Sequence, residues 1–573
     1  MTPDSDADSD ETEVPAGADP PALTAHVDSE GPGLAYLLST STENIVTDEP
    51  ALSSVIASEM EATVDAVAMA EGNETLGSEI KRGATWSSLS SIAIRLGTFA
   101  MGIVAARLIA PEQFGVFTVA LTVHAIILNI SEIGVGAYLV RHDGPPEKVA
   151  PTVMSVSLVT SASLAGLMYL TAPFLAESLG SADASGPIRI LALTVLLAGP
   201  SAVPNALLVR SFRQDRIFVS QVLSFLSSNS ILVVLAIAGS GAYALAWSRV
   251  AGHLVQTIAL IILAGRVVRP GLDRILLRRI LRFGLPLAGS SLLGFATNNV
   301  DFIVVGRQLG SEPLGLFSLA YNVSSWGFGV LSPVIAAVAM PAFARVRHDR
   351  ERLPVFMTTA LQAVLFLALP LSALTIALSG PLIDSVYGGR WAGAAPALAI
   401  VALYGALRVP SDLFVNTTIA FGRTRALFVM QIVYFAALIP MMVIGVEAIG
   451  IEGAARAHAA GLALTFMPPM LWLICKCTGV RLRALFVAAM PPLAAATVAG
   501  SVSFGVTHVV DGTWLRLIAG GLAGVLVYAA LLGPWLRRTV PAARDLWRDG
   551  GERSPADALA TDSMGRNDGG QDD

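Results

Sequence analysis

The sequence predicts an all-α integral membrane protein with about fourteen transmembrane helices, arranged as two six-helix lobes and two appended C-terminal helices. Of its 573 residues, 54% are apolar and 14% are charged, against about 45–50% and about 25% in soluble proteins. Apolar runs of about twenty residues, the length that crosses a bilayer core of about 30 Å, recur fourteen times. This composition excludes a water-soluble globular protein. Two cysteines are too few for a disulfide scaffold or a four-thiolate zinc site.

Both ends of the chain are polar. Residues 1–80 contain eighteen acidic side chains and no lysine or arginine, which is typical of a disordered acidic tail. Residues 541–573 contain eight acidic and four basic side chains and are expected to form a second polar tail. The intervening residues 81–540 carry 33 basic and 17 acidic side chains. The membrane body is therefore basic although the whole chain is acidic.

The apolar runs divide the body into domains. We expect an N-lobe at 81–265, a basic interfacial linker at 266–283, a C-lobe at 284–476 and the appended helices at 477–540. The expected spans are 86–108, 115–138, 151–173, 188–209, 217–238, 242–265, 286–306, 314–340, 355–379, 393–420, 426–446, 450–475, 484–506 and 514–536.

The distribution of basic residues predicts the orientation. With the N-terminus in the cytoplasm, the loops on the inner side carry 24 lysines and arginines and the outer ends carry five. Short cytoplasmic loops are enriched in basic residues, so both termini are expected in the cytoplasm and the chain in the cytoplasmic (inner) membrane. An odd number of helices would destroy this alternation.

The two lobes are predicted from an internal repeat, because transporters are commonly built from related halves. A shift of 200 residues superimposes Arg82, Arg107, Glu112, Gly115, Phe117 and Ala120 on Arg282, Arg307, Glu312, Gly315, Phe317 and Ala320. A shift of 210 residues lays Phe218, Val219 and Gln221 on Phe428, Val429 and Gln431. Six helices separate the members of each pair, so the repeat is parallel. The competing explanation is chance similarity between apolar segments.

Several of these residues also carry a resemblance to a known family. They are Arg82, Gly83, Ala84 and Trp86, the turn at 106–115, and Asn298, Asn299, Asp301, Gly306, Arg307, Leu309 and Gly310. Over about 85–510 the chain resembles bacterial oligosaccharide flippases, the polysaccharide repeat-unit exporters of the multidrug/oligosaccharidyl-lipid/polysaccharide superfamily. The resemblance implies a cavity that opens alternately to either side and moves an undecaprenyl-diphosphate-linked oligosaccharide outward for polysaccharide or lipopolysaccharide biosynthesis.

Charged residues within the spans are the candidate substrate-binding residues, because such groups are costly in a membrane. Arg95 lies thirteen residues after Arg82 and twelve before Arg107, which places it near mid-membrane. A guanidinium group is well matched to a diphosphate. The alternative is an ion pair with Glu132 on the second helix. The two interpretations are compatible, since a substrate could displace the carboxylate.

Helix seven carries a second polar group, formed by Asn298, Asn299 and Asp301. These residues are candidates for binding a coupling ion or sugar hydroxyls, and the alternative is a structural hydrogen bond between helices. Arg408 in the tenth span is a further candidate, with local pairing to Asp412 across a kink at Pro410 as its alternative.

Other charged or titratable positions in the spans complete the set. Arg249 in the sixth span has no obvious partner on its own helix and is a candidate cavity arginine. Arg456 follows Glu452 by four residues, a spacing that predicts a structural ion pair. The histidines of the spans could carry protons, although packing roles are favoured for each: His124, His253 and His458.

The motif content indicates a transporter and not an enzyme. The sequence has no phosphate-binding Gly-rich loop with Lys and Ser or Thr, and no His/Cys cluster with metal-ligand spacing, so no cofactor or metal is expected. The expected partners are a polyprenyl-diphosphate-linked glycan, membrane lipids and other glycan-assembly membrane proteins, without nucleic acid. Two alternatives remain: a multidrug or cation antiporter, whose cargo would favour a carboxylate-lined cavity, and an integral-membrane enzyme of glycan assembly.

Overall fold

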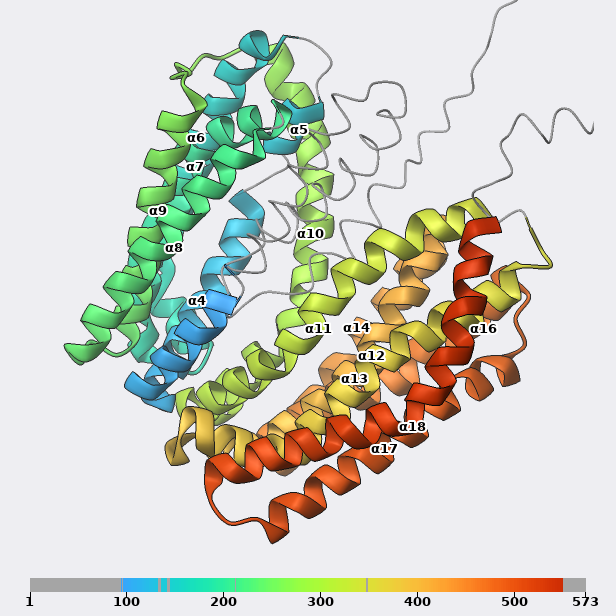
Figure 1. The fold of residues 1–573 in the computed structure, drawn as a ribbon. Coiled ribbons are helices and arrows are strands. Elements are labelled where there is room, and N and C mark those ends of the chain that lie inside the picture. The colour runs from blue at the N-terminus through green and yellow to red at the C-terminus, as the bar shows by residue number, and fades with distance from the viewer. Residues whose placement is uncertain are drawn as a thin grey trace, which may run out of the picture.

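The structure is a computed structural model that describes Ile94 and residues 96–131, 135–141, 145–211, 213–346 and 349–549. Throughout these ranges the regular elements are helices, and no strand occurs (Figure 1). The all-α membrane fold is therefore confirmed. The acidic tail at 1–80 and most of the tail at 541–573 lie outside the described residues.

The described part of the N-lobe begins with a helical segment at Leu96–Leu108. Its elements are α4 (Pro111–Ser131), α5 (Val135–Arg141), α6 (Pro146–Ser178), the 3₁₀-helix η2 (Ala182–Ala184), α7 (Ser185–Arg210), α8 (Gln214–Ile237) and α9 (Ala242–Ala264).

The C-lobe begins with two 36-residue helices, α10 (Arg274–Leu309) and α11 (Ser311–Val346). It continues with α12 (Leu353–Leu382), η3 (Ile383–Tyr387), η4 (Gly389–Trp391), α13 (Ala394–Ala420), α14 (Thr424–Ile449), α15 (Ile451–Gly461), η5 (Leu462–Phe466) and α16 (Met467–Thr478). The last two helices are α17 (Leu482–Val509) and α18 (Thr513–Asp549).

Eleven helical segments among the described residues are long and apolar enough to cross a membrane. Helices α10 and α11 cover the expected seventh and eighth spans, and Leu96–Leu108 covers the end of the first. Wherever the structure describes them, the predicted spans thus coincide with helix, whereas the total of fourteen membrane crossings stays a prediction. Large apolar side chains are exposed on many of these helices, such as Leu170 (78% exposed) and Ile237 (70% exposed), as expected for surfaces in contact with lipid.

The basic linker expected at 266–283 is only partly helical. Residues 266–273 are not helical, and the helix that begins at Arg274 continues without a break into the seventh span. Asp273 caps this helix, because its carboxylate accepts hydrogen bonds from the backbone N–H groups of Ile275 and Leu276 at 2.8 and 3.2 Å. The cap fixes where α10 starts.

The expected twelfth span is interrupted. It consists of α15, the π-helical turn η5 and α16. The interruption lies directly before Pro468 and Pro469, which cannot donate backbone hydrogen bonds and so disturb the preceding turn. By contrast, Pro410 lies within the continuous helix α13.

Two bundles make up the molecule (Figure 1). Helices α6 to α9 form the first with α4, and helices α11 to α16 form the second. The bundles meet where α4 and α11 begin, at the lower left of the view, and diverge toward its top. Helices α17 and α18 pack on α12 at the outer side of the second bundle, so the pair is appended to the C-lobe as predicted.

The contact between the bundles is reciprocal. A Cβ atom on Gly115 would lie 1.7 Å from the carbonyl oxygen of Ser311, and one on Gly315 would lie 1.9 Å from the carbonyl oxygen of Pro111. Gly315 is the counterpart of Gly115, and Ser311 is the counterpart of Pro111, each 200 positions later. The contact of Gly115 with Ser311 is therefore repeated by the contact of Gly315 with Pro111, as expected for two halves related by a two-fold axis. The parallel repeat read from the sequence therefore places α4 and α11 against each other.

A second set of interlobe contacts, here called the latch, joins residues 106–107 to residues 385–391. The Arg107 guanidinium donates hydrogen bonds to the carbonyl oxygens of Val386, at 2.7 Å, and of Ser385. Arg390 donates to the carbonyl oxygen of Arg107 at 2.6 Å, and the Trp391 indole N–H donates to that of Ala106 at 2.8 Å. The latch and the glycine contact close the same face of the molecule.

Candidate functional site

A carboxylate and an imidazole are paired in the interior of the C-lobe, between α10 and α15. Oδ2 of Asp301 lies 3.2 Å from Nε2 of His458, and the two side chains are 0% and 4% exposed. The other carboxylate oxygen of Asp301 accepts the backbone N–H of Phe302 at 3.0 Å. Neither Oδ2 nor Nε2 has a hydrogen-bond partner among the described residues. A buried carboxylate without a partner is costly, and the imidazole of His458 is the group placed to pair with it.

Tyrosines from three more helices surround His458. The ring of Tyr404 on α13 lies 5.0 Å from the imidazole, centroid to centroid, and that of Tyr321 on α11 lies at 6.3 Å. The hydroxyl of Tyr434 on α14 is 3.5 Å from Nδ1 of His458. These five residues are called the C-lobe polar cluster. Helices α10, α11, α13, α14 and α15 thus converge on one imidazole.

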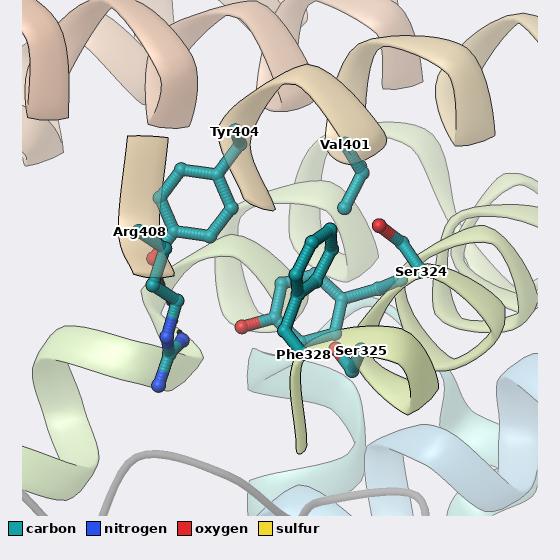
Figure 2. Close-up of a pocket in the computed structure, with 7 residues that line it drawn as sticks. Ser324, Ser325, Phe328, Val401, Tyr404 and Arg408 are labelled. Carbon is teal, nitrogen blue, oxygen red and sulfur yellow. Dashed lines mark hydrogen bonds between the residues drawn. The ribbon is translucent and has the colours of Figure 1, made fainter. Parts of the chain in front are cut away.

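A pocket adjoins this cluster between α11 and α13 (Figure 2). It contains about 300 Å³ of empty volume, part of which is open to the surroundings. Its lining residues are Tyr321, Ser324, Ser325, Phe328, Val401, Tyr404 and Arg408. Because Tyr321 and Tyr404 belong to both the pocket and the cluster, the pocket reaches the neighbourhood of His458.

Charges alternate along α13 at the edge of this pocket. Arg408 donates a long hydrogen bond of 3.5 Å to the Tyr404 hydroxyl, one turn earlier. Asp412, one turn later, accepts a hydrogen bond of 2.5 Å from the hydroxyl of Ser332 on α11. Arg408 and Asp412 also interact electrostatically, as their i,i+4 spacing on one helix allows.

The structure brings two predicted site residues, Asp301 and Arg408, to the polar cluster and the pocket. Asn299, two residues before Asp301 on α10, is buried, at 1% exposure. Arg249 lies in the other lobe, on α9, with its guanidinium carbon 5.4 Å from the centre of the Phe117 ring on α4.

The remaining predicted site residues, Arg95 and Glu132, lie outside the described residues. Asn298 belongs to α10, and its side chain also lies outside the description. Their assignment to substrate binding stays a prediction, as do those of Arg249, Arg408, Asn299 and Asp301. The structural pair of Glu452 and Arg456 is confirmed, at 2.9 Å and in a largely exposed position.

Sequence reasoning missed most of the polar cluster. His458, for which a packing role was favoured, is the direct partner of Asp301. Tyr404 precedes Arg408 by four residues, so the i,i+4 rule could have placed both on one helix face. Tyr321 and Tyr434 carried no signal, because nothing in a sequence shows which helices converge. Within the described part of the chain, no group of three or more His, Cys, Asp or Glu side chains is placed to hold a metal ion.

Comparisons with known proteins give a consistent result. A family described as polysaccharide biosynthesis protein matches residues 104–396, about half of the chain. The succinoglycan biosynthesis transport protein ExoT of Rhizobium meliloti (strain 1021) is 28% identical over 81% of this chain and 96% of its own length. The lipopolysaccharide biosynthesis protein WzxC of Escherichia coli (strain K12) is 26% identical over 65% of this chain and 76% of its own length.

Two solved structures share the fold. The lipid II flippase MurJ, in an inward closed conformation, has a TM-score of 0.65 at 14% identity, covering 80% of this chain and all of its own. An inward-facing multidrug resistance transporter of the MATE family has a TM-score of 0.54 at 18% identity, covering 68% of this chain and 95% of its own. At these identities the likeness establishes the fold alone.

Proposed function

This chain belongs to the polysaccharide biosynthesis protein family, and on that premise we propose that it is a flippase that carries a lipid-linked oligosaccharide from one leaflet of the membrane to the other. The names of its relatives, a succinoglycan transport protein and a lipopolysaccharide biosynthesis protein, support a glycan cargo. The fold of a lipid II flippase supports a lipid-linked one. Transport, and not catalysis, is the proposed activity.

The observation that carries the proposal is the asymmetry between the two ends of the lobe interface. At one end the lobes contact each other through Gly115, Gly315 and the latch, and at the other end the bundles diverge (Figure 1). A two-lobed carrier whose lobes meet at one face and diverge toward the other corresponds to one of the two arrangements that alternating access requires.

The orientation follows from the charge distribution. With both termini in the cytoplasm and the protein in the inner membrane, α4 and α11 begin at the outer face. The contact between them then closes the outside, and the diverging end faces the cytoplasm. The cargo, built on the cytoplasmic side, would enter there.

The anionic headgroup is the part of the cargo that must be held. A polyprenyl tail can stay in lipid, whereas a diphosphate needs positive partners within the membrane. Arg95, Arg249 and Arg408 are proposed to provide them, with Asn298 and Asn299 binding sugar hydroxyls, Asp301 serving the coupling ion and Glu132 acting as the carboxylate that the diphosphate displaces. Lipids and other glycan-assembly membrane proteins are the proposed neighbours.

The proposal is tested with purified protein in phosphatidylethanolamine and phosphatidylglycerol vesicles. The vesicles contain the lipid-linked glycan fraction extracted from cells that lack this gene. Membrane-impermeant periodate then oxidises only the outer-leaflet glycan. We expect protein-containing vesicles to expose all of the glycan with time and empty vesicles to expose about half, the outer-leaflet share. Protein that moves no glycan but exports cationic dyes would instead identify a drug antiporter, and glycan chemically altered by the protein alone would identify an enzyme.

A further inference from the structure

The Asp301–His458 pair lies deep in the C-lobe and has no role in closing the interlobe face. We propose that this pair binds and releases one proton during each transport cycle, and so couples glycan movement to a proton gradient. The inference rests on the proposed flippase function and assigns its energy source to two named side chains. Both are nearly inaccessible to solvent, at 0% and 4% exposure.

The proton changes the charge of the pair. When His458 is protonated at Nε2, the imidazolium and the Asp301 carboxylate, 3.2 Å apart, form a neutral pair. When the proton leaves His458 for water, an unbalanced carboxylate remains in an apolar interior, which is the less stable arrangement. The pair therefore gives up its proton only when the surroundings of the carboxylate change.

The other charged and titratable groups around the pair are balanced. The rings of Tyr321 on α11 and Tyr404 on α13 and the hydroxyl of Tyr434 on α14 face the imidazole, and none of these side chains adds a charge. Arg408 and Asp412 on α13 offset each other, and Glu452 and Arg456 on α15 pair at the surface. The turn η5 contributes no titratable side chain. A proton on His458 is thus the group whose gain or loss changes the charge of the C-lobe polar cluster.

The pocket offers the proton a path. It shares Tyr321 and Tyr404 with the cluster and is also lined by Ser324 and Ser325 (Figure 2). The buried hydroxyl of Ser324 has no hydrogen-bond partner among the described residues, so it is available to a water molecule in the pocket. Water between this hydroxyl and the tyrosines would connect His458 to the space outside the pocket.

Helix α10 connects the proton site to the lobe arrangement. It packs on α4 and α6 of the N-lobe and on α11, α14 and α15 of the C-lobe. The Asp301–His458 contact joins α10 to α15, so proton release weakens one of the contacts that hold α10 in the C-lobe. Because α10 also packs on α4 and α6, a change in that contact alters how α10 packs against the N-lobe.

The test uses the full-length protein in the vesicles described above, with the extracted glycan fraction as cargo. Valinomycin and equal K⁺ on both sides hold the membrane potential at zero while a pH difference of about one unit is imposed. For the wild-type protein, we expect the equilibrium ratio of glycan between the leaflets to shift about tenfold per pH unit if one proton moves with each glycan. In Asp301→Asn and His458→Gln we expect no shift.

His124→Gln is the matched control. His124 is a second buried histidine, at 1% exposure, and it bonds the Thr194 hydroxyl at 2.6 Å in the N-lobe. This variant should keep the shift of the wild-type protein. A wild-type distribution that ignores the pH difference, a full shift in either C-lobe variant, or loss of the shift in His124→Gln would overturn the proposal.

A second measurement does not depend on transport. Infrared difference spectra of ¹⁵N-histidine-labelled protein, recorded from about pH 5 to about pH 8, should contain an imidazole band that is absent from His458→Gln and altered in Asp301→Asn. If the spectra of the wild-type protein and His458→Gln coincide, the proton site is refuted. If the band is present but neither the wild-type protein nor any variant moves glycan, the flippase function is refuted and the proton site is retained.

Discussion

The hydroxyl of Thr118 donates a hydrogen bond of 3.2 Å to the hydroxyl of Ser318. The two residues occupy equivalent positions in the two halves of the chain. Both side chains are buried, at 1% and 0% exposure, on α4 and α11 respectively. They lie one turn beyond Gly115 and Gly315, so the near-two-fold axis of the molecule passes between these pairs. An outward-open state requires that each pair separate.

A disulfide between these two positions should therefore stop transport. In a Cys475→Ser and Cys477→Ser background, we expect Thr118→Cys with Ser318→Cys to cross-link under mild oxidation, because the present hydroxyl oxygens are already 3.2 Å apart and a disulfide needs about 2 Å between sulfur atoms. Glycan flipping should cease and return on reduction. The two single-cysteine variants are the controls, and flipping by the cross-linked protein would mean that the lobes do not part here.

A side chain at the glycine contact should have the opposite effect on the closed face. In Gly115→Val, the new Cβ would lie 1.7 Å from the carbonyl oxygen of Ser311. Overpacking of this kind costs about 1–3 kcal/mol, so we expect closure to be disfavoured roughly fivefold to a hundredfold and flipping to slow accordingly. Gly166→Val, where a Cβ meets nothing within 4 Å, should behave as the wild-type protein, and equal flipping by both variants would contradict the assigned contact.

The latch should set how long the face stays closed. Arg107→Ala removes the hydrogen bonds to the carbonyl oxygens of Ser385 and Val386. Because the side chain is partly exposed, we expect a loss of about 1 kcal/mol. In the double-cysteine protein this should slow disulfide formation between positions 118 and 318 about fivefold. Cross-linking as fast as in the parent protein would show that the latch has no influence on closure.

Arg95 is the strongest prediction from the sequence alone. We expect Arg95→Ala to insert into the membrane at wild-type levels and to abolish glycan export, because a diphosphate at mid-membrane would lose its bidentate partner. Arg95→Lys, which keeps the charge and loses the fork of donors, should retain part of the activity. Surface polysaccharide measured in a complemented deletion strain distinguishes these outcomes, and normal export by Arg95→Ala would refute the role.

The acidic tail is expected to be dispensable for translocation itself. Deletion of residues 1–75 removes most of the eighteen acidic side chains of the tail and leaves Lys81 and Arg82, which support the orientation. Flipping in vesicles should remain close to that of the full chain. A truncated protein that is inserted and stable but inactive would assign the tail a regulatory role.

The fold was largely predictable because it depends on signals that are local or periodic. Apolar runs of membrane length predicted the helices, and the 200-residue repeat predicted that Arg107 and Arg307 lie in equivalent turns. The repeat did not reveal that Gly115 meets Ser311 or that Arg107 reaches Val386, since contacts across an axis depend on how the halves are placed.

The site was less predictable for the same reason. Asp301 and Arg408 were selected because charge inside an apolar run is visible in one helix. The pairing of Asp301 with His458 joins helices whose sequences are about 150 residues apart, and no spacing rule relates them. Tyr404 alone had a local signal, its position one turn before Arg408.

A single residue, Gly310, separates α10 from α11. Its φ of 84° is one that glycine adopts readily, and consecutive Cα atoms are held about 3.8 Å apart. The last turn of α10 and the first turn of α11 are therefore held next to each other by one residue. Any rearrangement within the C-lobe therefore has to keep the end of α10 next to the beginning of α11.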